Sequence, residues 1–404
     1  MPDQRLILTE WEERSNVHLD HDQRLALQTA CPWIQLRQES GTDMFTVRSA
    51  SNKVGVINVD DLQVMIRPAK CSADLVVFMM AYTKNPTGFS PDSSPLADDA
   101  NLWEAMLRAF AHQLKSALRF GVHRGYLEIE EALPTVRGRI RFGDQIRVTQ
   151  RLVPPLQVTY DEYTEDVLEN RLLKAALLEA HRFPIRSEGL RRILRQSEPL
   201  LANVTAVSFD PRNIPTPTWT RLNRHLQHAV ELATLILEHM SIALNVGATS
   251  SPSFVVDMAD VFENFVVAGL RDALELTERE FQQTSRALSL AENVALEPDY
   301  SWWKGGRCIA IGDVKYKRVN VEGVVHANLY QVFSYATAAN LPSATLIYAQ
   351  GKADRVSHHV TMANKRLDVE VLDLNGGPEL ALEELRQVAE RIRGKAQSQA
   401  VPAA

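Results

Sequence analysis

The sequence predicts a multidomain α+β protein with a β-rich N-terminal region, a mixed helical middle region and a C-terminal α/β core. Its 404 residues exceed one typical domain and suggest two or three. Short apolar runs dominate the start, and helical periodicity becomes prominent in the middle. The expected order is a β-rich domain at 1–84, a linker or mobile loop at 85–101, a mixed strand and helix domain at 102–244, a linker at 245–253, a C-terminal domain at 254–390 and a disordered tail at 391–404.

The N-terminal region is expected to contain a hairpin and a helix. Apolar runs at 54–59 and 62–66 flank the acidic pair Asp60 and Asp61, which suits two strands around a turn. In the second run, apolar residues alternate with a second set of positions that includes Gln63 and Arg67, which is the period of two of a strand. A helix is expected near 72–83.

Helices and one strand-rich stretch are expected in the middle region. A long helix should run from about 101 to 120, where Gly121 stops it. Strand is expected at about 125–160, and helices follow near 165–182, 187–203 and 217–244. Beyond the second linker the expected order is helix, strands, helix and a further strand at 343–348.

The charge balance limits how the chain meets nucleic acid. A net charge of −6 argues against non-specific wrapping, so any contact must come from local basic patches, with a partner's help. Arg137, Arg139 and Arg141 alternate with apolar residues, so a strand there would present one arginine face. That face suits contact with DNA or a partner through the guanidinium fork, and the alternative is a solvated strand face.

The compartment is expected to be the cytoplasm. Cys31, Cys71 and Cys308 are an odd number without metal-ligand spacing, which fits a reducing environment. The first residues lack an apolar signal core, and no apolar run approaches a membrane span.

The segment richest in chemistry is a hairpin flanked by acids. Asp299 follows Pro298, and the turn Lys304–Arg307 contains two adjacent glycines. A two-residue loop would pair Asp299 with Gly312, whereas a three-residue loop would pair it with Asp313. Either register brings the carboxylates within a few ångströms, and the period of two places Lys315 on the face of Asp313. Two carboxylates that close favour a cation such as Mg²⁺.

Two flanking helices strengthen this interpretation. In the helix expected at 260–270, Glu263 borders the buried stripe, and its alternative role is a charge near the helix start. Gln331 and Tyr335 share one face of a later helix, and their alternative is ordinary helix packing. The alternative for Asp299 and Asp313 is capping of turns, with Lys315 merely flanking a buried strand.

Several other residues are candidates for contact with DNA or a partner. They are the local cations Lys304, Arg307, Lys317 and Arg318. Trp302 and Trp303 lie near the hairpin tip, where they suit packing better than stacking on bases.

The pattern P-D-(x)13-D-x-K resembles the PD-(D/E)xK nucleases, and the Q-x-x-x-Y helix resembles their RecB-like branch. Most of the chain resembles the McrC family, the nuclease subunits of McrBC modification-dependent restriction systems. The resemblance is carried by residues 64–70, 125–126, 133–140, 163–171, 262–263 and 312–317, the last matching the D-A-K-Y core with valine for alanine.

The resemblance implies a Mg²⁺-dependent DNA endonuclease, with Mn²⁺ as a possible substitute. Asp299, Asp313 and Glu263 would bind the metal, Lys315 would complete the catalytic set, and Gln331 and Tyr335 would support it. The implied partner is an McrB-like AAA+ GTPase hexamer that uses the GTP, with the middle domain docking on it. The implied substrate is double-stranded DNA, modified or foreign. No G-x-x-x-x-G-K-[ST] phosphate loop is present, so this chain is not expected to bind nucleotide.

Two other functions remain open from the sequence. One is a non-catalytic AAA+ activator or scaffold with a vestigial nuclease fold, which the intact acid and lysine set argues against. The other is a stand-alone RecB-like repair nuclease. A long N-terminal region without helicase motifs favours docking to a separate motor instead.

Overall fold

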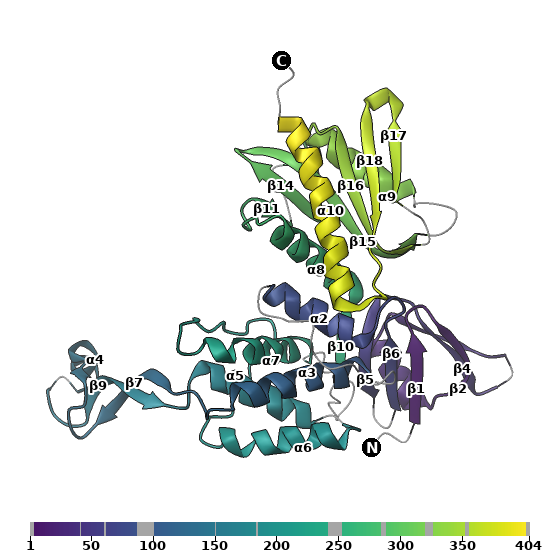
Figure 1. The fold of residues 1–404 in the computed structure, drawn as a ribbon. Helices are drawn as coiled ribbons and strands as arrows, with labels where there is room; N and C mark the ends of the chain where they lie inside the picture. The colour runs from purple at the N-terminus through teal and green to yellow at the C-terminus, as the bar shows by residue number, and fades with distance from the viewer. Residues whose placement is uncertain are drawn as a thin grey trace. The chain divides into compact units, whose positions relative to one another are not determined.

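The chain divides into two compact units of mixed α and β structure (Figure 1). The first comprises Met1–Ala105 and Ile242–Ala404, and the second comprises Met106–Ser241. The structure, a computed structural model, describes residues 4–40, 42–59, 62–86, 101–149, 151–182, 185–240, 253–283, 288–319, 326–351 and 355–400. The expected mixture of sheets and helices is confirmed.

Two small sheets form the N-terminal part of the first unit. Their strands are β1 (Gln4–Thr9), β2 (Glu13–His18), β3 (Ile34–Gln38), β4 (Met44–Ser49), β5 (Lys53–Val59), β6 (Leu62–Arg67) and β10 (Phe254–Asp257). One sheet has the order β1-β6-β5-β10, with β1 and β6 parallel, and the other has the order β2-β4-β3. The predicted hairpin is confirmed as β5 and β6, and its turn at 60–61 lies outside the described residues.

A larger sheet forms the C-terminal part of the same unit. Its strands, in the order β11-β14-β15-β16-β18-β17, are β11 (Phe281–Gln282), β14 (Tyr300–Lys304), β15 (Arg307–Val319), β16 (Ser343–Gly351), β18 (Lys365–Val371) and β17 (Val356–Val360). β15, β16 and β18 are parallel, and β14 pairs with β15 as an antiparallel hairpin. A separate ribbon joins β12 (Ser289–Ala291) and β13 (Val294–Ala295).

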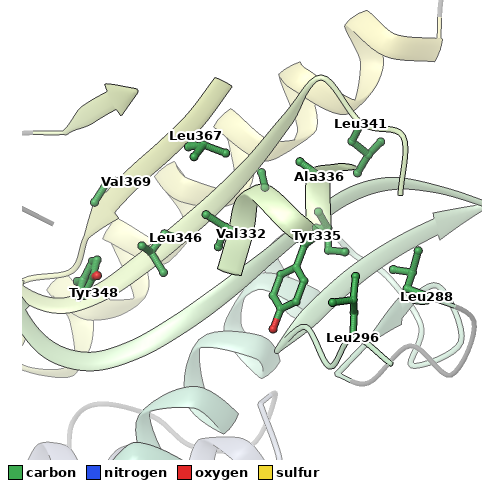
Figure 2. Packing of buried hydrophobic residues seen from close by; sticks show 12 residues of the cluster. Leu288, Leu296, Val332, Tyr335, Ala336, Leu341, Leu346, Tyr348, Leu367 and Val369 are labelled. Atoms are coloured by element: carbon green, nitrogen blue, oxygen red, sulfur yellow. The ribbon is translucent and has the colours of Figure 1, made fainter. Parts of the chain in front are cut away.

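Helices pack around these sheets. The helices of the first unit are α1 (His21–Ala30), α2 (Ala73–Lys84), the start of α3 (Leu102–Ala117), α8 (Met258–Ala273), α9 (His326–Ala338) and α10 (Gly377–Ala400). α9 packs on β15, β16 and β18, while α8 and α10 pack on each other and on β15 (Figure 1). An apolar cluster between α9 and the sheet includes Val332, Leu346 and Leu367 (Figure 2).

The expected domain limits need correction at two places. Residues 254–257, expected to open the C-terminal domain, form β10 and pair with β5, so the first and last predicted domains share one unit. The tail expected from 391 is helical as far as Ala400, because α10 buries Val388, Ile392 and Ala396 along one face. The expected linkers at 85–101 and 245–253 lie mostly outside the described residues.

The second unit combines a three-stranded sheet with helices. Its elements after α3 are β7 (Gly125–Leu133), β8 (Arg139–Ile140), α4 (Phe142–Thr149), β9 (Leu156–Thr164), α5 (Leu168–His181), α6 (Glu188–Ser197) and α7 (Gln227–His239), and its sheet has the order β7-β9-β8. The continuous strand region expected at 125–160 is interrupted by α4.

Among the described residues, no helix is long and apolar enough to cross a membrane.

Buried ion pairs fasten α10 to β18. Asp368 accepts an ion pair from Lys395 at 2.7 Å, and Glu370 pairs with Arg391 at 2.8 Å and Arg355 at 3.0 Å. Both carboxylate side chains are only 4% exposed. Because a buried charge is costly without its partner, these pairs specify where α10 lies on the sheet.

We predict that Asp368→Ala lowers the free energy of unfolding by about 1.5–3 kcal/mol, because it removes the buried acceptor of charge-assisted hydrogen bonds from Lys395 and Arg366. Chemical denaturation near neutral pH measures the change. The matched control is Glu383→Ala, which removes an exposed pair with Arg386 on the same helix and should cost below about 1 kcal/mol. Equal losses in the two variants would contradict the assigned role.

Candidate functional site

The β14–β15 hairpin has a two-residue turn and an offset register. Gly305 and Gly306 have φ of 59° and 78°, the left-handed values that such a turn requires, and Lys304 pairs with Arg307. A bulge between Trp302 and Trp303 then shifts the register, so that Tyr300 pairs with Gly312. Asp299 and Asp313 are therefore the next pair of opposed positions along the two strands. The expected turn is right, but the bulge produces the pairing expected from the longer loop.

Gly312 allows a close approach beneath this hairpin. A Cβ atom there would collide with the ring of Tyr300 and with the Thr345 carbonyl group. Tyr300 is fully buried and stacks on Phe281, with ring centroids 5.3 Å apart. This packing holds β14 against β15 immediately before the acidic residues.

Three charged side chains meet where the hairpin opens. The Lys315 ammonium lies 2.5 Å from Asp313 Oδ2 and 3.6 Å from Asp299 Oδ2. The backbone N–H of Val314 donates a 2.6 Å hydrogen bond to Asp299 Oδ2. Asp313 is fully buried, whereas the Asp299 and Lys315 side chains are 14% and 24% exposed. The cluster is thus a partly enclosed site with a buried acid at its base.

The electrostatics of the site favour binding of a further cation. Burial, followed by the nearby charge of Asp299, raises the pKa of Asp313 to about 7 despite Lys315. Burial lowers the pKa of Lys315, but the attraction of Asp313 and Asp299 outweighs it and leaves that pKa above its usual value. A divalent cation bound here would stabilise the ionised form of this buried carboxyl group.

Glu263 lies beside the cluster, on α8. Burial and the charge of Asp299 raise the pKa of Glu263, and Lys315 acts in the opposite direction. Gln283 donates a 3.1 Å hydrogen bond to Glu263 Oε1 and bonds Asn264 at 2.8 Å. Glu263 is therefore an oriented carboxylate next to the cluster, and Gln283 is a neighbour that the sequence analysis missed.

Gln331 and Tyr335 support the segment before Asp299. Gln331 donates to the Tyr335 hydroxyl at 2.7 Å, and that hydroxyl donates to the Glu297 carbonyl at 2.9 Å. Tyr335 is buried beside Leu296 in the cluster under α9 (Figure 2). The pair thus holds the chain two residues ahead of Asp299.

Asn328 and Tyr348 form a second polar contact that the sequence analysis missed. Asn328 donates to the Tyr348 hydroxyl at 2.7 Å, and Tyr348 is the register partner of Lys315 on β16. The charges of Asp313 and Lys315 both act on the pKa of Tyr348, which burial raises. The position of Asn328 in the sequence could have revealed it, because Asn328 lies three residues before Gln331 on the same helix face.

Residues next to the N-terminal sheet also hold β15 in position. The hydroxyl of Tyr316, the residue after Lys315, donates to Glu10 Oε2 at 3.0 Å. Glu10 also accepts from the backbone N–H of Ala69 at 2.7 Å, and the Lys70 ammonium lies 3.8 Å from the Tyr316 ring centroid. The position of Lys315 therefore depends on residues far away in the sequence.

The three arginines of the middle region do not form the single face expected for contact with DNA or a partner. Arg137 stacks on Tyr160 at 3.7 Å and Arg141 pairs with Glu130 at 2.8 Å, so the expected single arginine face is wrong, and only Arg139 of the three lies in a strand. Gly138, at φ 69°, breaks the strand between them.

The other candidates lie along the hairpin. Lys304 and Arg307 are exposed at its tip, and Lys317 is exposed on β15. The side chain of Arg318 lies outside the described residues. Trp303 packs against the apolar cluster and donates to Ser301 at 2.9 Å, which agrees with the packing interpretation.

The donor set fits a hard divalent cation bound through few protein ligands. Among the described residues, no three His, Cys, Asp or Glu side chains gather closely enough to hold a metal ion by themselves. Both Asp313 carboxylate oxygens are buried, with Lys315 2.5 Å from Oδ2, and Asp299 lies beside them. Mg²⁺ commonly binds one or two carboxylates and keeps several waters, so this pair is adequate.

Fold and site together define a two-unit α and β protein with an acid–acid–lysine cluster on its C-terminal sheet. A family model described as McrBC 5-methylcytosine restriction system component matches residues 49–349. The chain belongs to this family, which confirms the resemblance seen in its motifs. No curated protein matches the chain.

Two solved structures from Thermococcus gammatolerans are similar. A half-complex from a tetradecameric assembly of McrB AAA+ hexamers with bound McrC matches with a TM-score of 0.59 and 20% identity, over 96% of this chain and 100% of that chain. A cryo-EM structure of the McrBC complex matches with a TM-score of 0.43 and 22% identity, over 67% and 88%. The first likeness shows a shared fold.

We predict that Tyr316→Phe lowers the free energy of unfolding by about 1–3 kcal/mol, because it removes a donor from the buried Glu10 carboxylate. Urea denaturation measures the loss. Tyr126→Phe, at an exposed ring on β7, serves as the control and should change stability by less than about 0.5 kcal/mol. An unchanged midpoint for Tyr316→Phe would show that this contact does not hold β15.

Proposed function

We propose that this chain is a Mg²⁺-dependent endodeoxyribonuclease subunit of the PD-(D/E)xK type in an McrBC-like restriction complex. The observation that carries the proposal is the meeting of Asp299, Asp313 and Lys315 beside Glu263, in the order that the nuclease motif requires. Family membership supports a role in restriction.

The proposed reaction is hydrolysis of a DNA phosphodiester bond. Asp299 and Asp313 would hold Mg²⁺, which supplies charge stabilisation at the phosphoryl oxygens and lowers the pKa of bound water. The Lys315 ammonium, already held by both aspartates, would donate hydrogen bonds to the attacked phosphate and offset its growing negative charge. Glu263 would accept a hydrogen bond from the attacking water. Water oxygen would form the new bond to phosphorus and lose one proton to Glu263, which returns it to solvent, and the ester oxygen would leave with a proton from solvent.

The surroundings of the site would maintain this arrangement. Tyr335 fixes the Glu297 carbonyl ahead of Asp299, and the Val314 N–H orients the Asp299 carboxylate. A pre-oriented set avoids reorganisation during the reaction, which is the main advantage of such sites.

A docking surface for the partner is proposed on the arm of the second unit. The arm is the β7-β9-β8 sheet with α4, which Figure 1 shows extending from α5. Exposed apolar residues gather on it, including Phe142, Ile146 and Val148 at 53%, 58% and 67% exposure. Several exposed apolar residues on one short helix support a protein interface there. The proposed partner is an McrB-like AAA+ GTPase hexamer that hydrolyses GTP and delivers modified or foreign DNA.

One observation favours a second candidate, a non-catalytic activator of the motor. Glu263 does not meet the two aspartates in a three-carboxylate group within the described structure. In that case the apolar arm would still act on the partner, but the acid–acid–lysine cluster would have only a structural role.

We predict that Asp313→Asn and Lys315→Ala each lower DNA cleavage in Mg²⁺ at least about 100-fold, because each removes charge stabilisation from the reacting phosphate. Cleavage of plasmid DNA by the complex with motor and GTP measures the effect. Glu292→Gln, at an exposed position between β12 and β13, is the control. Wild-type cleavage by either folded site variant would favour the non-catalytic activator.

We predict that Ile146→Asp combined with Val148→Asp lowers stimulation of the motor's GTP hydrolysis at least about tenfold, because buried charge at an interface without a partner costs several kcal/mol. Steady-state hydrolysis, with and without this chain, provides the measurement. Leu222→Asp, 78% exposed in the same unit but off the arm, should stimulate normally. Full stimulation by the arm variant would place docking elsewhere.

A further inference from the structure

A basic groove lies between α3 and α6 in the second unit, and none of its lining residues belongs to the acid–acid–lysine cluster. Its volume is about 650 Å³, and its polar lining includes Arg108, His112 and Lys115 from α3, Arg119 from the turn after α3, and Ser187, the N-cap of α6. Lys115 and Arg119 also line an adjoining hollow of about 230 Å³. No carboxylate lines either space within the part of the chain that the structure describes.

Arg108, His112 and Lys115 form one row along α3, and Arg119 follows in the turn after the helix. Spacings of four and three residues keep the first three on one helix face, and Ala111 and Leu114 are buried on α3. At a rise of about 1.5 Å per residue the helical part of the row is roughly 10 Å long.

The row also lacks compensation from nearby acids. Across the described residues, none of the four side chains forms an ion pair or hydrogen bond with a carboxylate. Three other arginines of this unit, Arg124, Arg141 and Arg171, do pair with acids. Cations without an acid partner that line a groove are suited to binding an anion from outside the chain.

We propose that this groove binds the phosphodiester backbone of DNA, as a holding site separate from the proposed nuclease site. Phosphates follow one strand of a duplex at about 3.4 Å per base pair, so the part of the row on α3 spans about three base pairs, and Arg119 extends it. The first turn of α6, capped by Ser187, adds partial positive charge at the groove. The choice of DNA over another polyanion rests on the proposed function.

Backbone contact without base readout suits the rest of the chain. The net charge of −6 gives little general attraction to nucleic acid, so a local groove has to supply it. The alternative occupant, an acidic segment of the partner protein, would use the same charges but would not show the salt dependence of a nucleic acid contact.

The test compares Lys115→Glu/Arg119→Glu with the control Arg212→Glu/Arg221→Glu, which makes the same charge change at exposed positions off the groove. Both pairs are exposed, so the fold should persist, and circular dichroism checks this. Binding of a short fluorescent duplex is followed by anisotropy in EDTA over a range of salt. Because no cleavage occurs in EDTA, this readout is independent of the nuclease assignment.

We expect the groove variant to bind DNA at least about tenfold more weakly than the control at low salt. Removing two phosphate contacts should also make the slope of log K against log salt shallower by about 1.8. Lys115→Gln/Arg119→Gln should show the same change in slope without added repulsion, and it replaces the Glu variant if that one misfolds.

Three results would overturn the proposal. They are no measurable binding by the wild-type chain at low salt, equal affinity and slope in the groove and control variants, or normal DNA binding with lost stimulation of the motor. The last result would assign the groove to an acidic segment of the partner. Failure of the nuclease assignment would appear separately, as undiminished cleavage by Asp313→Asn.

Discussion

Burial of the Asp313 carboxylate is the constraint on which the site depends. A charge removed from water costs several kcal/mol unless a partner compensates it, and Asp313 lies in the middle of an apolar sheet. Lys315 can compensate it only because residues two apart share a face of β15. Asp299 reaches the same place only because a bulge at Ile309 of β15 shifts the register by one residue. A shift of one position between the two strands would move Asp299 away from Asp313 and Lys315.

That register is maintained from several directions. Tyr335 fixes the chain before Asp299, Tyr300 packs over Gly312, and Glu10 holds Tyr316 from the N-terminal sheet. The C-terminal sheet is therefore not a self-sufficient module. Strand β15 pairs with strands of the C-terminal sheet, but side-chain contacts with the sheet that contains β1 and β6 also hold it in position. This explains why the first and last parts of the chain form one compact unit.

Sequence reasoning succeeded where the signal is local and failed where distant pairing decides. The acids, the lysine and the glycine turn fall within 17 positions, so their proximity follows from strand geometry alone. The register did not, because the bulge at Ile309 adds one residue to β15 beyond the two-residue turn, and nothing in the local sequence marks that bulge. β10 was assigned to the wrong region because its partner β5 is almost 200 residues earlier. The arginine stripe failed because Gly138 and α4 break the period of two, although the glycine was visible.

The return of β10 to the N-terminal sheet has a consequence for how the chain is made. On a ribosome, β5 emerges with one edge exposed and stays so until residues 254–257 are synthesised. At about 5–20 residues per second, that interval is on the order of 10–40 s. The second unit is encoded wholly within the interval. The second unit can thus fold before the first. During that time the unpaired edge of β5 is a place where a nascent chain would aggregate or recruit a chaperone.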